Sequence, residues 1–405
     1  MKIGVYGGTF NPPHLGHVTA ARAVFELLKL DLLLLVPAGL PPHKALPAGS
    51  PTPEQRLEMT RLAGEQLGLS GKVRVLDLEL RREGRSYTSD TLAQLKAQYP
   101  DDELWLLMGT DMFLTLQTWH EPEKILSLAG IAAFGRTEED TEELFSIQRD
   151  YLYRTYPQAR LFTLTIPGVI DISSTELRDQ LAKGEGGRLL PPAVYGYILR
   201  EGLYNTGADL KHLPLSQLRP VALSYLKHKR IPHVLGTEQE AIRLAERYGA
   251  DVEKARVAAL LHDSTKKLDL SAQLALCQHY GIQLDEMEQW ALKLLHSKTG
   301  AAIARDVFGV DDEIYNAIWY HTTGHADMTL LEKIIYIADY IEPSRDFPGV
   351  EELRRVCYES LDAGVLLGLE MTVEEMTAMG NPVHPATLAA RDFLKGQINS
   401  GETQR

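Results

Sequence analysis

The chain has 405 residues, of which 44% are hydrophobic and 24% are charged, and its formal net charge is −13. Its length exceeds what one hydrophobic core usually supports, so we expect two domains of about 200 residues each. The acidic balance argues against a nucleic-acid partner, because nucleic-acid-binding faces are basic. The most apolar run, residues 32–36, is far too short to span a bilayer, and Met1-Lys2 leave no room for a signal peptide. Since Cys277 and Cys357 also lack metal-ligand spacing, we expect a cytoplasmic protein with reduced thiols and no membrane partner.

Short apolar runs alternate with helical patterns through the first half of the chain. The runs are residues 3–6, 32–36, 73–77, 104–108, 131–134 and 161–165. Such alternation predicts an α/β fold of the Rossmann-like type, with a parallel sheet and helices on both of its faces. In such folds the carboxyl ends of the strands share one edge of the sheet, and ligands bind there.

The most informative stretch follows the first predicted strand. Residues 7–17 read Gly-Gly-Thr-Phe-Asn-Pro-Pro-His-Leu-Gly-His, and a helical pattern follows over residues 18–30. A glycine-rich turn before a helix brings backbone N–H groups and the positive end of the helix dipole onto one anion. His14 and His17 are three residues apart, so both can face the same phosphates. The order matches the T/H-x-G-H signature of the nucleotidyltransferase superfamily, although a glycine- and proline-rich loop with two solvated histidines is the plainer alternative.

Four further segments fall at the same predicted edge of the sheet. They are residues 41–44, 86–91, 109–111 and 172–178, which carry a lysine, hydroxyl-bearing helix starts, an aspartate and an arginine. Each has a structural explanation when taken alone, because Ser and Thr cap helices and charged side chains are often solvated. Only a shared ligand site explains why all of them lie at one edge.

This set resembles the bacterial nicotinate-nucleotide adenylyltransferases over roughly residues 1–205. The resemblance implies Mg²⁺-assisted transfer of AMP from ATP to nicotinate mononucleotide, with His14 and His17 as catalytic residues. It implies an ATP site made of Gly7, Gly8, Thr9, Phe10, His14, His17, Ile172, Ser173, Ser174 and Arg178. It implies a nicotinate-mononucleotide site made of Lys44, Tyr87, Thr88, Gly109, Asp111 and Trp119. The family often has Asp where Asn11 stands, a change that keeps a side-chain acceptor.

Two other members of this structural class remain as alternatives. A pantetheine-phosphate adenylyltransferase is the nearer one, but Gly109-Thr110-Asp111 and the helix start at Tyr87-Thr88 favour the pyridine-nucleotide branch. A class I aminoacyl-tRNA synthetase fragment also has an HxGH motif. The acidic balance and the lack of a Lys-Met-Ser-Lys-Ser loop argue against it.

The pattern changes near residue 205. Glu201-Gly202 is typical of a helix end followed by glycine, and a polar, glycine- and proline-containing linker is predicted over residues 206–216. From residue 217 to residue 405 strand patterns vanish and helical periodicity dominates. We therefore expect an N-terminal α/β domain over residues 1–205 and an all-α domain over residues 217–405.

The all-α half contains a candidate metal centre. His262-Asp263 ends an apolar helical run, and further candidate ligands are His233, His296, His321 and Asp339. Imidazole nitrogens and carboxylate oxygens suit Fe, Mn, Co, Ni or Zn, and six ligands can hold one or two ions. Because the chain has 13 histidines, chance spacing is common, and a lone His321 would more often be structural.

The segments around these residues resemble HD-domain phosphohydrolases of the symmetrical diadenosine tetraphosphate type. They are residues 233–237, 260–266, 296–300, 321–324 and 336–343. The resemblance implies a catalytic Asp263, cleavage of diadenosine tetraphosphate into two ADP, and phosphate-chain contacts from Lys266, His325 and Arg345. A nucleotide-sensing regulatory module and a hydrolase of another nucleotide are the alternatives, but the complete set of candidate ligands favours an active hydrolase. The sequence thus predicts a bifunctional enzyme and leaves a homo-oligomer open.

Overall fold

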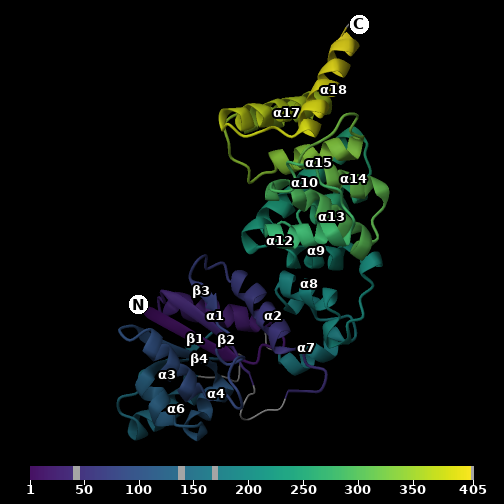
Figure 1. Ribbon diagram of the computed structural model, residues 1–405. Coiled ribbons are helices and arrows are strands. Elements are labelled where there is room, and N and C mark those ends of the chain that lie inside the picture. The colour runs from purple at the N-terminus through teal and green to yellow at the C-terminus, as the bar shows by residue number, and fades with distance from the viewer. Residues whose placement is uncertain (40–45, 136–141, 167–171, 403–405) are drawn as a thin grey trace. The chain divides into compact units, whose positions relative to one another are not determined.

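The computed structural model describes residues 1–39, 46–135, 142–166 and 172–402. It divides the chain into two compact units, Met1–Ala208 and Asp209–Arg405. Figure 1 shows a sheet with helices in the first unit and helices alone in the second. Over the described ranges, no helix combines the length and the apolar character needed to cross a membrane. Cys277 and Cys357 are buried and unpaired.

The first unit is built on a six-stranded parallel sheet in the order β3-β2-β1-β4-β5-β6. Its strands are β1 (Lys2–Gly8), β2 (Leu32–Pro37), β3 (Val73–Val75), β4 (Glu103–Gly109), β5 (Ala129–Gly135) and β6 (Leu161–Thr165). All six predicted strands and the Rossmann-like fold are confirmed. β3 ends two residues earlier than predicted, although the Leu76 N–H still donates to the Leu35 carbonyl at 2.9 Å.

Both faces of the sheet are buried at the strands β2 and β5, which explains why these two strands are apolar without interruption. Successive side chains point to opposite faces. In β2, Leu32, Leu34 and Val36 pack into one core, whereas Leu33 and Leu35 pack into the other. The two cores hold the carboxyl ends of β1 and β4 side by side at the centre of the sheet, where the strand order reverses.

Helices cover the sheet and complete the first unit. They are α1 (Leu15–Leu27), α2 (Pro53–Glu65), α3 (Thr88–Gln98), α4 (Thr110–Leu114), α5 (Pro122–Leu128), α6 (Glu142–Thr155), α7 (Ser174–Leu181), α8 (Pro192–Arg200) and the 3₁₀ turns η1 (Leu116–Thr118), η2 (Gly187–Leu189) and η3 (Leu203–Asn205). The predicted bounds of α1 were wrong by three residues at each end. The helix begins directly after His14 and ends at Leu27, and Lys29 adopts a left-handed φ of 52° that a helix cannot continue.

The described residues of the second unit form helices and connecting loops, and none of them lies in a strand. Its elements are η4 (Leu210–His212), α9 (Leu215–Ser224), η5 (His228–Arg230), α10 (Ile231–Tyr248), α11 (Val252–Leu261), α12 (Leu270–His279), α13 (Leu292–Phe308), α14 (Asp312–Tyr320), α15 (Leu330–Ile341), α16 (Val350–Glu359), α17 (Leu361–Ala378) and α18 (Pro385–Glu402). α10, α11, α13, α14 and α15 pack on one another and bring their ends together. The predicted all-α architecture is confirmed.

Candidate active sites

A cavity of about 470 Å³ lies at the carboxyl edge of the first unit's sheet. Its lining includes fifteen of the sixteen nucleotide-site residues predicted from the sequence: Gly7, Gly8, Thr9, Phe10, His14, His17, Tyr87, Thr88, Gly109, Asp111, Trp119, Ile172, Ser173, Ser174 and Arg178. The sixteenth, Lys44, lies outside the described residues. Five separate segments therefore converge on one cavity at the point where doubly wound folds bind nucleotides.

The two histidines of the first motif stand together at the start of α1. His14 is the N-cap residue, and its backbone N–H donates to Nδ1 of His17 at 3.2 Å. Their ring centroids are 3.8 Å apart, and His14 is only 2% exposed. A loop with two solvated histidines is therefore excluded. Because Nδ1 of His17 accepts this bond, a neutral His17 carries its proton on Nε2.

The start of α7 supplies a further part of the cavity wall. Ser173 is its N-cap residue, since its Oγ accepts from the Glu176 N–H at 3.1 Å, and both Ser173 and Ser174 line the cavity. Arg178 donates to the backbone oxygen of Asn11 at 2.8 Å, which joins α7 to the first motif. The side-chain oxygen of Asn11 accepts from the Tyr204 hydroxyl at 2.7 Å, so the residue does act as an acceptor.

Of the remaining predicted residues, Tyr87 and Thr88 lie at the start of α3, Gly109 and Asp111 lie at the start of α4, and Trp119 directly follows η1. Tyr87, not a serine or threonine, is the N-cap of α3, and its ring lies 4.2 Å from that of His120. Ser86 instead donates to the Glu79 backbone oxygen at 3.4 Å. The N-cap residue of α4 is Gly109, so Asp111 does not cap this helix. Asp111 lines the cavity instead.

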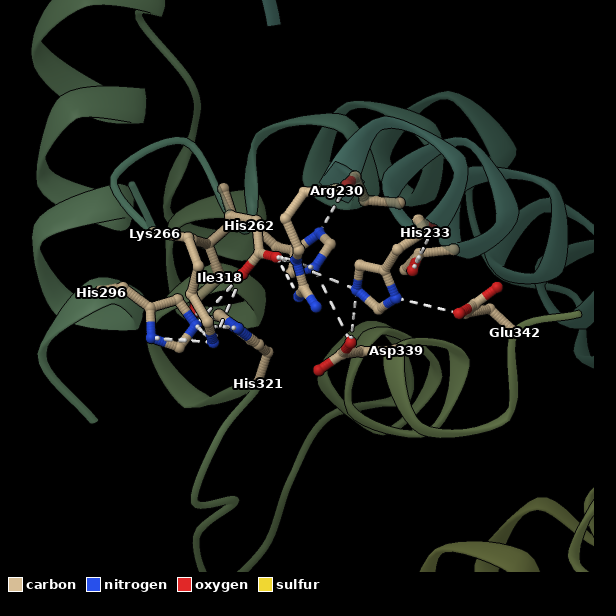
Figure 2. A network of polar contacts seen from close by, with 12 residues as sticks. Arg230, His233, His262, Lys266, His296, Ile318, His321, Asp339 and Glu342 are labelled. Carbon is tan, nitrogen blue, oxygen red and sulfur yellow. Dashed lines mark hydrogen bonds and ion pairs between the residues drawn. The ribbon is translucent and has the colours of Figure 1, made fainter. Parts of the chain in front are cut away.

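In the second unit the predicted metal ligands gather at the ends and inner faces of five helices (Figure 2). His233 comes from α10, His262 and Asp263 from the end of α11, His296 from α13, His321 from the end of α14 and Asp339 from α15. Two overlapping groups have ligand atoms within 4.8 Å of one another: His233, His262 and Asp339, and His262, Asp263 and His321. His296 joins them, with Nε2 at 3.2 Å from Oδ1 of Asp263.

Local hydrogen bonds turn three of these imidazoles toward the centre. Nδ1 of His262 lies 2.6 Å from the Ala259 carbonyl, and Nδ1 of His321 lies 2.7 Å from the Ile318 carbonyl. A carbonyl only accepts, so Nδ1 holds the proton and Nε2 keeps its lone pair. Nδ1 of His233 faces the Glu342 carboxylate at 3.0 Å, with the same result. Such partners are typical of metal-binding histidines.

Electrostatics keep the ligands in the forms that bind metal. Burial lowers the pKa of His262 and of His296, and burial with the neighbouring His262 and His296 lowers the pKa of His321 well below its usual value. For Asp263 and Asp339, burial opposes ionisation, but the surrounding imidazoles hold both pKa values well below the usual range. Neutral imidazoles beside ionised carboxylates are what cation binding requires.

The buried polar atoms fit a bound cation. Nε2 of His233, Nε2 of His262 and Oδ1 of Asp263 are buried and form no hydrogen bond of regular geometry with the described residues. His233 Nε2 does approach Oδ1 of Asp339 to 2.9 Å. Unsatisfied buried donors and acceptors are costly, and a divalent ion among them would satisfy the lone pairs at once. Mixed nitrogen and oxygen donors suit a transition metal.

Comparisons with known proteins agree with the division of the chain into an N-terminal and a C-terminal unit. Residues 5–180 match the family described as cytidylyltransferase-like, and residues 230–344 match the HD domain. A protein of Shewanella sp. (strain MR-4) that carries the name "Probable nicotinate-nucleotide adenylyltransferase" is 40% identical over 216 residues, covering 50% of this chain and 99% of that protein. The chain belongs to the nicotinate-nucleotide adenylyltransferase family in its N-terminal half and to the HD family in its C-terminal half.

Two further relatives match the HD half alone. The symmetrical bis(5'-nucleosyl)-tetraphosphatase of Halalkalibacterium halodurans is 40% identical over 171 residues, covering 42% of this chain and 91% of that protein. A solved HD superfamily hydrolase from Clostridium acetobutylicum is 39% identical, with a TM-score of 0.44, and covers 46% of this chain and 98% of its own.

Three cations line the accessible side of the HD ligands. Arg230 donates through Nε to Oδ2 of Asp263 at 2.8 Å, and Arg345 donates to Oδ1 of Asp339 at 2.8 Å. Nζ of Lys266 lies 2.9 Å from Nε2 of His296. These side chains are 25–33% exposed, whereas Asp263 is 1% exposed. His325 instead lies 3.1 Å from Glu332, with its ring against Tyr320, so its contacts differ from those of the three cations.

Sequence reasoning missed two residues of the HD site. Arg230 precedes His233 by one helical turn, and the basic run 228–230 was the available signal. Glu342 lies in a segment singled out for its resemblance, yet it received no role. Its place beside His233 depends on α15 packing against α10, which spacing alone does not reveal.

A third cluster in the HD unit is closed by its own ion pairs. Asp285, Glu288 and His384 have ligand atoms within 4.8 Å of one another. Lys298 lies 2.5 and 2.6 Å from the two Glu288 oxygens, and His384 Nε2 lies 2.9 Å from Asp285. These ion pairs connect His384, directly before α18, to the loop between α12 and α13.

Proposed function

We propose that the chain is a bifunctional enzyme that acts on adenine nucleotides. The N-terminal unit transfers AMP from ATP to nicotinate mononucleotide and releases deamido-NAD and pyrophosphate. The C-terminal unit hydrolyses diadenosine tetraphosphate to two ADP at a centre of one or two transition-metal ions. Family membership supports the two reaction classes, and the two clusters of side chains support the assignment of residues.

In the N-terminal unit, the convergence of the predicted residues on one cavity carries the proposal. An oxygen of the acceptor's own phosphate attacks the α-phosphorus of ATP, and the bond to the bridging oxygen of pyrophosphate breaks. Because the acceptor supplies the nucleophile, the protein has only to align the groups and stabilise charge. His14, His17 and Arg178 would surround the phosphates, and Mg²⁺ bound to the triphosphate would neutralise part of their charge. Tyr87, Trp119 and the other residues near α3 and α4 hold the pyridine nucleotide.

Substrate preference tests this assignment. We expect nicotinate mononucleotide to have a far higher kcat/KM than nicotinamide mononucleotide, because the chain belongs to the acid-specific family. Initial rates of pyrophosphate release with each acceptor provide the measurement, and pantetheine phosphate serves as the control acceptor. Equal kcat/KM values for the two pyridine nucleotides would contradict the proposal, and turnover of pantetheine phosphate would favour the alternative.

In the C-terminal unit, the cluster of buried ligand atoms carries the proposal. Divalent ions at such a site lower the pKa of water and neutralise phosphate charge. Asp263 and Asp339 supply carboxylates, and the Nε2 atoms of the histidines complete the donor set. Arg230, Lys266 and Arg345 lie where a polyphosphate chain would approach, and guanidinium groups bind phosphate through paired hydrogen bonds. His325 stays a weaker candidate for the same task.

Symmetrical cleavage follows from where water attacks. A water oxygen bonds to one inner phosphorus, the bridging oxygen between the two inner phosphates leaves with the other half, and two ADP result. A regulatory module that only senses nucleotides does not need a complete set of histidine and aspartate metal ligands. The presence of that set therefore favours hydrolysis over sensing.

His262→Ala separates the two activities. His262 is fully buried among the ligands, so we expect the variant to lose hydrolysis and the bound transition metal. Adenylyl transfer should remain within twofold of the wild-type rate, because none of the described residues of the N-terminal site lies in this unit. The measurement is both rates and the metal content on one preparation. A parallel fall of both rates in a folded variant would contradict independent sites.

A further inference from the structure

A buried arginine lies beneath the first motif of the N-terminal unit. Arg56, in α2, is 0% exposed and is not among the residues that line the cavity. Within the described ranges its guanidinium pairs with backbone carbonyls and with no carboxylate. Burying a charge without a counter-ion costs desolvation free energy, so the hydrogen bonds of the guanidinium must offset that loss.

Those bonds join the loops that follow the neighbouring strands β1 and β2. Nη1 of Arg56 donates to the carbonyls of Thr9 at 3.0 Å and Ala38 at 2.6 Å, and Nη2 donates to Gly39 at 3.4 Å. Thr9 follows β1, whereas Ala38 and Gly39 follow β2. A planar guanidinium holds several acceptors in one fixed geometry, which a lysine ammonium does not.

The Thr9 bond also fixes the next peptide group. In a trans peptide the C=O and the following N–H point in opposite directions, so the Thr9 carbonyl on Arg56 turns the Phe10 N–H away from it. Phe10 has a φ of 47°, in the left-handed region that bulky residues rarely adopt. Such strain persists only where surrounding contacts over-determine it. The Phe10 ring then lies 5.4 Å from the ring of His17.

We propose that Arg56 is a positioning residue for adenylyl transfer, which aligns the phosphate-binding loop and His17 through Thr9 and Phe10. This proposal rests on the function proposed above for the N-terminal unit. Arg56 acts without contact to either substrate, because it lies outside the cavity lining. Loss of Arg56 should therefore lower the rate of adenylyl transfer in the bound complex more than it weakens binding of the acceptor.

Two variants and a matched control test the proposal. Arg56→Lys keeps the positive charge but not the planar group with several N–H donors, and Arg56→Met removes both. Arg61→Met, on the same helix, changes a side chain that is 52% exposed and pairs with Glu58 at 3.7 Å. We expect kcat to fall roughly 10- to 100-fold in both Arg56 variants, because small misalignments of reacting groups have effects of that size. The KM for nicotinate mononucleotide should stay within twofold, and Arg61→Met should match the wild type.

Circular dichroism and thermal unfolding of each variant accompany the kinetics. A folded Arg56→Lys with kcat within twofold of wild type would overturn the proposal. So would unfolding of both Arg56 variants, which would assign Arg56 to stability, or a rise in KM alone, which reports lost binding. If the wild-type chain itself fails to transfer AMP, the proposed function fails instead, so the two failures are distinguishable.

Discussion

Single hydrogen bonds decide the chemistry of the HD histidines. His262 and His321 each end a helix, and each donates from Nδ1 to a carbonyl three residues earlier. A residue at a helix end can form this local bond because the last carbonyls of a helix lack N–H partners. The position of a histidine at the end of a helix thus fixes both its tautomer and the direction of Nε2.

Glu342 performs the same task for His233 from a different helix. We expect Glu342→Gln to weaken metal binding by about ten- to hundredfold, because it replaces a charged acceptor beside a metal-binding imidazole. Calorimetric titration of the chelator-treated protein with Mn²⁺ or Zn²⁺ measures the affinity. Glu352→Gln is the control, since Glu352 is 57% exposed and pairs with Arg355. Unchanged affinity in Glu342→Gln would show that His233 needs no such partner.

Site residues that lie close together in the sequence were predictable, whereas contacts between residues far apart in the sequence were not. The His262-Asp263 doublet and the two histidines of the first motif are visible in the sequence because their neighbours are local. Arg56 contacts a carbonyl 47 residues away, and Glu342 contacts His233 across 109 residues. Such roles depend on which helices pack together, and that information is distributed over the whole core.

At the scale of elements, the close approach of α10 and α15 brings Glu342 to His233. Gly236, one turn after His233, faces Glu342, and a Cβ at this position would overlap with its Oε2. We expect Gly236→Ala to displace the carboxylate and lower metal affinity about tenfold, although the substituted residue touches no metal ligand directly. The same titration tests it, with Gly396→Ala as control because a Cβ there meets nothing within 4 Å. Wild-type affinity in Gly236→Ala would contradict this packing argument.

Element types followed from the sequence more reliably than element ends. All six strands were predicted from short apolar runs, which are uninterrupted in the fully buried strands β2 and β5. The bounds of α1 were wrong because a left-handed Lys29 ends the helix, and the serine and threonine expected to cap α3 are not its cap. The Ser86 hydroxyl instead donates to the Glu79 backbone carbonyl, a contact that the residues around Ser86 do not predict.

The whole molecule contains two units with their own interiors and their own sites. We expect two thermal transitions that respond to different ligands. A metal at one hundred times its dissociation constant should stabilise the HD unit by about 2.7 kcal/mol, and ATP should stabilise only the other unit. Differential scanning calorimetry with each ligand measures both shifts. A single transition that moves equally with either ligand would contradict two independent units.

The pH dependence of the metal-free HD transition has a definite sign. Burial lowers the pKa values of His262, His296 and His321 in the folded chain, whereas unfolded histidines titrate near about 6.5. As the pH falls below about 6.5, the unfolded chain binds more protons, so the free energy of unfolding falls. Asp263 and Asp339 add a further loss below about pH 4, because their folded pKa values lie well below usual. Calorimetry from pH 7.5 to pH 5 should therefore show a falling Tm for this transition, and a rising Tm would contradict the assignment.

We propose that one chain holds both an adenylyltransferase and a symmetrical hydrolase. The most direct test is to incubate the chain, loaded in turn with Fe, Mn, Co, Ni or Zn, with diadenosine tetraphosphate and to separate the products by chromatography. We expect ADP as the sole product with at least one metal, and no product from His262→Ala. ATP plus AMP, or no turnover with any of these metals, would contradict it.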